Sequence, residues 1–193
     1  MKINKDFEEL FELLNKNSVF YIIVGGYAFA IHVEPRFTKD LDIFVKRDAE
    51  NAQKIIKTLH DFGFGSLELS DEDFLDPDQV IQIGNPPFRV DFLTSISGVT
   101  FEEVWNNRII GNYGSQKVNF IGKEELRKNK RAAGRKSDLL EIAKPLLDSY
   151  NIKSRLLANQ TSPLGQRVQN FLRDYLSDVP GDNSFGFPDH PFI

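Results

Sequence analysis

Two aspartates separated by a single residue lie in the segment "DLDIFV", residues 40–45. Side chains alternate across a β-strand, so the pattern predicts a strand whose core face carries Leu41, Ile43 and Val45. Asp40 and Asp42 then lie together on the opposite face. Neighbouring carboxylates repel each other unless a cation compensates them. A surface lysine is one such cation, but aspartate is disfavoured in strands and Mg²⁺ prefers carboxylate oxygens, so we interpret the pair as a candidate Mg²⁺ site.

Two glycines precede this strand. Gly25 and Gly26 follow the apolar run "SVFYIIV", residues 18–24, which predicts a buried strand, and they begin a short predicted helix. A glycine turn at a helix N-terminus lets backbone N–H groups approach a phosphate, and the helix dipole adds a partial positive charge there. An ordinary strand-to-helix turn is the alternative. The aspartate pair downstream favours phosphate binding.

A third carboxylate, Asp91, lies inside "FRVDFL", residues 88–93, which is also a predicted strand. If this strand is the neighbour of the Asp40–Asp42 strand, three carboxylates converge. Three carboxylates and two Mg²⁺ ions are the usual arrangement for in-line phosphoryl or nucleotidyl transfer. The alternative is a strand carboxylate that pairs with Arg89.

The ordered set of these motifs resembles the nucleotidyltransferase superfamily. That superfamily has an apolar strand, Gly-Gly or Gly-Ser, a helix, Asp-x-Asp on a strand and a third Asp on a later strand. The segments "VGGYAFAIHVEPRFTKDLDIFV" and "RVDFL" match this pattern, and "KNKRAAGRKSDLLEI" resembles bacterial members related to AbiEii-type toxins and to small antibiotic-modifying nucleotidyltransferases. The resemblance covers residues 18–148.

The resemblance implies an α/β (α+β) nucleotidyltransferase palm, a mixed β-sheet with flanking helices, followed by a C-terminal helical extension. It implies transfer of a nucleoside monophosphate from an NTP to an acceptor hydroxyl, with release of pyrophosphate. Two Mg²⁺ ions would be bound by the three aspartates and the phosphates by the two glycines. The remaining nucleotide-binding candidates are Arg36, Thr38, Lys130 and Arg135. Arg36 and Thr38 are expected to steady the triphosphate or the aspartate strand, and Lys130 or Arg135 to offset charge on the pyrophosphate.

The sequence is compatible with several classes of acceptor. Seven basic residues between Lys123 and Lys136 favour tRNA or another RNA in a toxin–antitoxin-like setting, although such a run is usually a solvated helix face. The acidic loop "SDEDFLDPD" favours a small aminoglycoside-like or lincosamide-like acceptor. A partner protein is a third acceptor. A non-catalytic antitoxin or binding partner of the same fold is the alternative from a different class.

The sequence suggests a domain over 1–150 and an extension over 151–193. The extension contains an amphipathic helix at about 162–178, a candidate surface for homo-oligomerisation, and a tail rich in Pro, Gly and Phe. Further predicted helices span 4–16 and begin at Asp48, Thr100 and Lys123, with a break at Gly134. Further predicted strands are "VIQIG" and a hairpin in "IIGNYGSQKVNFIG".

Composition narrows the remaining classes. The 193 residues contain no cysteine, which excludes disulfides and thiolate metal sites. The net charge of −4 gives no overall attraction to nucleic acid or to an anionic membrane, so any such contact requires a local patch. The N-terminus does not have the pattern of a signal peptide, and no apolar run is long enough to cross a bilayer. A cytoplasmic protein without membrane contacts is therefore the expectation.

Overall fold

The computed structural model describes residues 3–33, 38, 40–86, 88–135 and 138. The chain divides into two units, Met1–Ala133 and Gly134–Ile193. The second unit is described only at Gly134, Arg135 and Asp138, so the predicted boundary after residue 150, the helix at 162–178 and the tail lie outside the described residues. The architecture below is that of the first unit.

A six-stranded mixed sheet forms the centre of the first unit, with the strand order β3-β4-β2-β1-β6-β5. The pairs β2–β4 and β1–β6 are parallel, and the other neighbours are antiparallel. The strands are β1 (Tyr21–Ile23), β2 (Asp40–Val45), β3 (Val80–Ile83), β4 (Arg89–Leu93), β5 (Ile109–Tyr113) and β6 (Gln116–Phe120).

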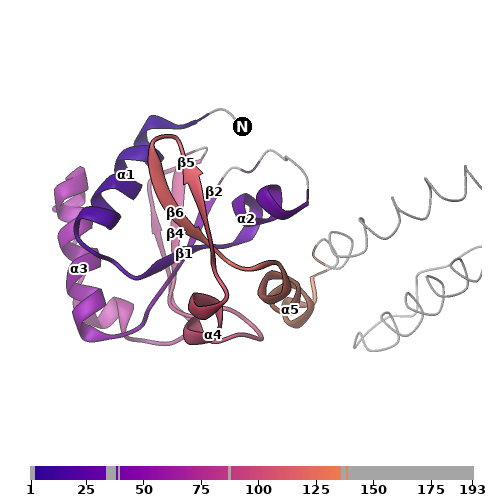
Figure 1. Cartoon of the computed structure of the whole chain (residues 1–193). Helices are drawn as coiled ribbons and strands as arrows, with labels where there is room; N and C mark the ends of the chain where they lie inside the picture. The colour runs from indigo at the N-terminus through magenta and orange to yellow at the C-terminus, as the bar shows by residue number, and fades with distance from the viewer. Residues whose placement is uncertain (1–2, 34–37, 39, 87, 136–137, 139–193) are drawn as a thin grey trace, which may run out of the picture. The chain divides into compact units, whose positions relative to one another are not determined.

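Helices cover both faces of this sheet, with α1 and α3 on one side and α2 and α5 on the other (Figure 1). Two short helical turns follow α3, one over His60–Phe64 and a 3-10 turn over Asp71–Phe74. The helices are α1 (Lys5–Lys16), α2 (Gly25–His32), α3 (Ala49–Leu59), α4 (Phe101–Asn106) and α5 (Lys123–Ala133). None of the helices in the described residues is long and apolar enough to cross a membrane.

Polar side chains fix the predicted helix starts. Asn4 accepts a hydrogen bond from the Asp6 amide at 2.8 Å. Asp48 accepts from the Asn51 amide at the start of α3, also at 2.8 Å. Thr100 accepts from the amide at position 103 at the start of α4. Each side-chain oxygen satisfies an N–H group that has no partner within its helix, which confirms these starts.

The core lies chiefly between the sheet and the α1–α3 layer. Leu41, Ile43 and Val45 of β2 are fully buried, as the alternation predicts. Phe44 is also buried, because its ring packs at 5.2 Å against Phe101 on the opposite face of the sheet. The aspartate face of β2 is therefore polar at the start of the strand and aromatic near its end.

The first strand is shorter than predicted. It begins at Tyr21 rather than Ser18, because Ser18 takes a left-handed conformation with φ of +54° as the chain leaves α1. The amides of the next two residues donate to groups outside the sheet. The Val19 amide donates to the Leu14 carbonyl, and the Phe20 amide donates to the side chain of the buried Asn51. A side chain of α3 thus replaces sheet pairing at the start of this run.

Candidate active site

Asp42 and Asp91 lie directly opposite each other on the parallel neighbours β2 and β4. The same register places Asp40 opposite Arg89. Neighbouring strands are about 4.8 Å apart, and residues in register point to the same face. The structure therefore confirms that the strand of Asp91 is the neighbour of the Asp40–Asp42 strand. It brings the three carboxylates to one face of the sheet, while their role as metal ligands stays a prediction.

Arg89 forms ion pairs with two of these carboxylates. Its Nη2 atom donates to Asp40 Oδ2 at 2.8 Å and to Asp91 Oδ2 at 3.0 Å. Its Nε atom lies 2.8 Å from Asp91 Oδ1. Both predicted arrangements of Asp91 therefore occur together: it pairs with Arg89, and it lies on the same face as Asp40 and Asp42.

The donor set fits Mg²⁺ in its chemistry. Oδ1 of Asp40 and Oδ1 of Asp91 are buried and accept no hydrogen bond from any described residue. Both oxygens have lone pairs that a metal cation could share, and at Asp91 Oδ1 that cation would compete with Arg89 Nε, which lies 2.8 Å away. Carboxylate oxygens are also the ligands that this hard cation prefers. Within the described ranges no three acidic or histidine side chains form a ready metal cluster. The guanidinium of Arg89 bridges the two carboxylates that a metal would have to share.

Gly25 brings the candidate phosphate-binding turn against this carboxylate face. Its φ is +59°, and a Cβ atom added to it would lie 2.0 Å from Asp42 Oδ2. The amide of Val24, the residue before helix α2, donates to the Asp42 carbonyl at 3.0 Å. The first turn of α2 contains no acidic residue, and its N-cap makes no side-chain hydrogen bond. The N-terminus of α2, with Gly25 and the buried Gly26, is therefore beside Asp42 and suited to an anion.

Thr38 acts on the backbone of the aspartate strand. Its Oγ1 atom donates to the carbonyl oxygen of Asp40 at 3.1 Å. This contact corresponds to one of the two roles expected for Thr38, the steadying of the strand. Arg36, the other candidate in this segment, lies outside the described residues.

The two basic candidates near the end of α5 differ in their surroundings. Lys130 is 6% exposed, and its amine lies 5.5 Å from the ring centre of Phe29 on α2. Arg135 belongs to the second unit, where its Nε atom donates to Asp138 at 2.6 Å. Asp138 thus pairs with a nearby base. The structure places Lys130 against α2 and gives Arg135 no position relative to the aspartates.

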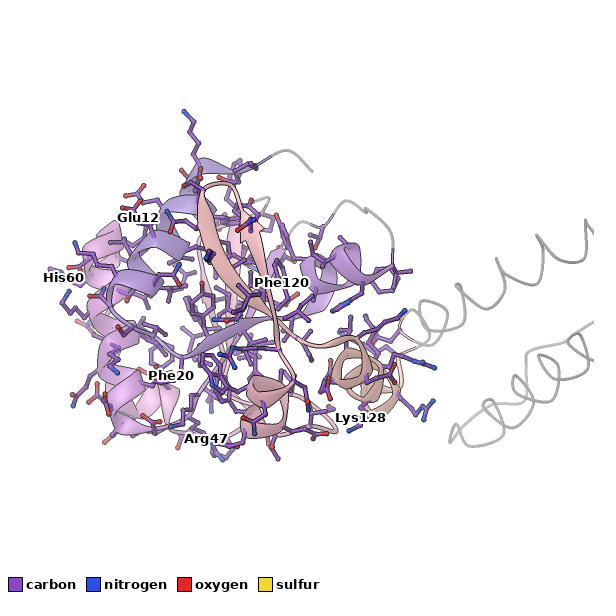
Figure 2. The ribbon with its side chains drawn as sticks, viewed as in Figure 1. Glu12, Phe20, Arg47, His60, Phe120 and Lys128 are labelled. Atoms are coloured by element: carbon purple, nitrogen blue, oxygen red, sulfur yellow. The ribbon has the colours of Figure 1, made fainter. Side chains whose placement is uncertain are left out.

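The basic run is partly neutralised by acidic neighbours. Arg127 Nη1 lies 3.6 Å from Glu124 Oε1, and Lys128 forms an ion pair with Glu103. Glu103 raises the pKa of Lys128 through its hydrogen bond and its negative charge. Figure 2 shows Lys128 on α5. Ion pairs of this kind leave less positive charge for an RNA backbone than the sequence alone indicates.

The acidic loop is remote from the three aspartates along the sheet. Asp71 accepts from Gln53 of α3 at 3.2 Å, and Asp78 accepts from Ser95, which follows β4. Ser95 comes four residues after Asp91, about 13 Å along an extended chain. The geometry gives no support to this loop as a lining of the carboxylate site.

Two residues extend the site beyond the sequence prediction. Gln82 of β3 lies opposite Asp91 and is placed to donate to its Oδ2 at 3.4 Å. Arg89 contacts Asp40 on the neighbouring strand as well as Asp91 on its own. The signal for Gln82 was its polar position within the short apolar strand "VIQI". The contact to Asp40 depends on strand register, which the sequence does not reveal.

Comparison with known proteins supports the fold. No protein-family profile and no curated protein matches the sequence. Among solved structures, the chain is similar to that of a "putative nucleotidyltransferase" from Thermotoga maritima, with a TM-score of 0.50 and 15% identity. The match covers 76% of this chain and 91% of that one. The chain thus has a nucleotidyltransferase-like fold, which confirms the predicted fold class, whereas the AbiEii-type relation stays a prediction.

Proposed function

We propose that this protein is a Mg²⁺-dependent nucleotidyltransferase that moves a nucleoside monophosphate from an NTP to an acceptor hydroxyl. The observation that carries the proposal is the register of β2 and β4, which sets Asp42 opposite Asp91. Gly25 packs its Cα against the same Asp42 side chain. Candidate metal ligands and a candidate phosphate-binding turn are therefore adjacent, as a metal-bridged triphosphate requires.

Each residue has a defined part in this proposal. Asp40, Asp42 and Asp91 would hold Mg²⁺, which when bound neutralises phosphate charge and favours ionisation of the acceptor hydroxyl. The backbone amides at Gly25 and Gly26 donate to phosphate oxygens of the NTP. Thr38 holds the backbone of Asp40 in place through its 3.1 Å hydrogen bond. The bond between the α-phosphorus and the bridging oxygen of pyrophosphate breaks as the acceptor oxygen bonds to the α-phosphorus. The acceptor hydroxyl gives up its proton to water, and Lys130 offsets negative charge on the departing pyrophosphate.

We propose RNA as the first acceptor to test. Helix α5 carries basic residues outside the carboxylate site, although Arg127 and Lys128 have acidic partners. The small-molecule alternative has lost its main support, because the acidic loop lies beyond the far end of β4. A partner protein as acceptor depends on neither charge feature.

The decisive experiment offers each α-labelled NTP with Mg²⁺ to total RNA, to cell protein and to a panel of aminoglycosides and lincosamides. We expect label on RNA with the native chain and a loss of at least 100-fold in Asp42→Asn, because transition-state electrostatics are typically worth that much. Asp76→Asn is the matched control, since Asp76 is exposed in the acidic loop.

The result separates the proposed acceptor from the proposed chemistry. Label only on the antibiotic panel, or only on protein, would replace RNA as acceptor and keep the nucleotidyl transfer. No label on any acceptor, with NTP binding unaffected in Asp42→Asn, would refute the enzyme and favour a binding partner of the same fold.

A further inference from the structure

A single arginine is the cationic partner of two of the three site carboxylates. Arg89 Nη2 lies 2.8 Å from Asp40 Oδ2 and 3.0 Å from Asp91 Oδ2. The side chains are partly or largely shielded from water, with exposures of 28% for Arg89, 29% for Asp40 and 9% for Asp91. An ion pair shielded to this degree is stronger than one on the open surface.

The backbone dictates this bridge. Arg89 comes two residues before Asp91 on β4, so both side chains point to the same face. The β2–β4 register sets Arg89 opposite Asp40. The planar guanidinium presents several donors at fixed angles, so it can reach across to one carboxylate and back to another. Lysine has only a point charge and cannot reproduce this geometry.

One of the contacts is poorly aligned. Arg89 Nε and Asp91 Oδ1 are 2.8 Å apart, yet neither atom makes a hydrogen bond to any described residue. The attraction at that contact is therefore electrostatic without the directional part of a hydrogen bond. Another cation of higher charge can replace such a contact at a lower cost than a fully aligned pair.

We propose that Arg89 is a positioning residue that holds Asp40 and Asp91 in place without metal and competes with a divalent cation for the same oxygens. The inference rests on the proposed function, because it assigns the competing cation to that site. Like-charged carboxylates on adjacent strands repel each other, and Arg89 relieves the repulsion before metal arrives. Metal binding then requires the guanidinium to release at least part of its contacts.

The proposal predicts opposite effects of Arg89 on the metal-free and metal-bound protein. Removal of the guanidinium leaves the carboxylates uncompensated, so the metal-free chain should melt at a lower temperature. The same change removes the competitor, so the metal should bind more tightly. A residue with a purely structural role would lower stability without raising metal affinity.

The test titrates MnCl₂ and MgCl₂ into the full chain, with calorimetry and thermal melting as readouts. We expect Arg89→Gln to bind Mn²⁺ about tenfold more tightly, the lower end of the effect of one adjacent opposite charge on a carboxylate. Arg89→Lys should lie between this variant and the native chain. Arg47→Gln is the control, because it removes the same charge from an exposed site beyond the far end of β2 (Figure 2).

Three outcomes would count against the proposal. Unchanged or weaker Mn²⁺ binding in both Arg89 variants, with binding lost in Asp42→Asn, overturns the competition and leaves the proposed function standing. An equal gain in Arg47→Gln shows a general charge effect and also overturns it. If neither the folded native chain nor Arg89→Lys binds Mn²⁺ or Mg²⁺, both the proposed metal site and this inference are wrong.

Discussion

At the scale of single residues, the contact between Gly25 and Asp42 restricts which residue can occupy position 25. The backbone at Gly25 has a φ of +59°, which L-residues with side chains adopt at a cost of about 1–2 kcal/mol. In addition, a methyl group there would overlap Asp42 Oδ2 at 2.0 Å. The conformation and the close approach thus both favour glycine, and the second links the turn to the candidate site.

We expect Gly25→Ala to lower the free energy of unfolding by about 2–3 kcal/mol, from backbone strain together with steric overlap. The folded variant should also bind Mg²⁺–NTP at least about tenfold more weakly, because Asp42 must move. Chemical denaturation and calorimetry measure the two effects. Gly63→Ala is the control: its φ is +98°, and an added Cβ meets no described atom within 4 Å. Normal NTP binding by Gly25→Ala would show that this glycine serves only the turn.

The site residues differ in how far the sequence predicted them. The aspartates were visible because Asp is rare in strands and its alternation with apolar residues is regular. The bridge from Arg89 to Asp40 was not, because it depends on which strands are neighbours and in what register. Lys130 was one of several similar bases, and only the packing of α5 on α2 distinguishes it by burial.

At the scale of elements, local signals predicted the starts of helices better than the start of the first strand. Caps at Asn4, Asp48 and Thr100 were read from side-chain chemistry and are present. The late start of β1 was not predicted, because the Asn51 side chain that accepts a hydrogen bond from the Phe20 amide is 31 residues away in the sequence. Tertiary contacts of this kind override strand propensity.

Asp48 at the start of α3 provides a test of element stability against pH. Burial opposes ionisation, but the Lys46 ammonium and the Asn51 amide outweigh it and lower the pKa of Asp48 below 3.8. A lowered carboxyl pKa stabilises the fold above the unfolded value, and this contribution disappears as the pH falls through the folded value.

We therefore expect Asp48→Asn to remove part of the acid sensitivity below pH about 4, while the amide oxygen still caps α3. At pH 7 the variant should be less stable by under about 1 kcal/mol, because the Lys46–Asp48 pair is partly exposed. Melting curves from pH 7 to 2.5 measure both effects. A constant difference between native and variant chains at every pH would show that Asp48 does not titrate in this way.

At the scale of the whole molecule, the order of motifs predicted the class of fold, and chain topology supplied what motifs could not. The mixture of strands and helices with short connections predicts a sheet with helices packed on it, and the family resemblance implies that this sheet is mixed. The placement of β4 beside β2 is a long-range pairing that creates the three-aspartate face. The sheet pairing also explains the position of the acidic loop. Because β3 runs antiparallel to β4, the loop that precedes β3 lies near the end of β4 and away from Asp91.

The last prediction concerns residues 180–193, which lie outside the described residues. The candidate site lies wholly within Met1–Ala133 except for Arg135, so truncation after Val179 should change Mg²⁺–NTP affinity by less than about twofold. The segment carries Phe185, Phe187 and Phe192, and aromatic side chains that gather on a surface commonly mark contact sites. We expect truncation to lower the mass measured by light scattering if copies of the chain associate through this tail. Reduced NTP affinity would show that the tail reaches the site, and unchanged mass together with unchanged melting would exclude its role in assembly.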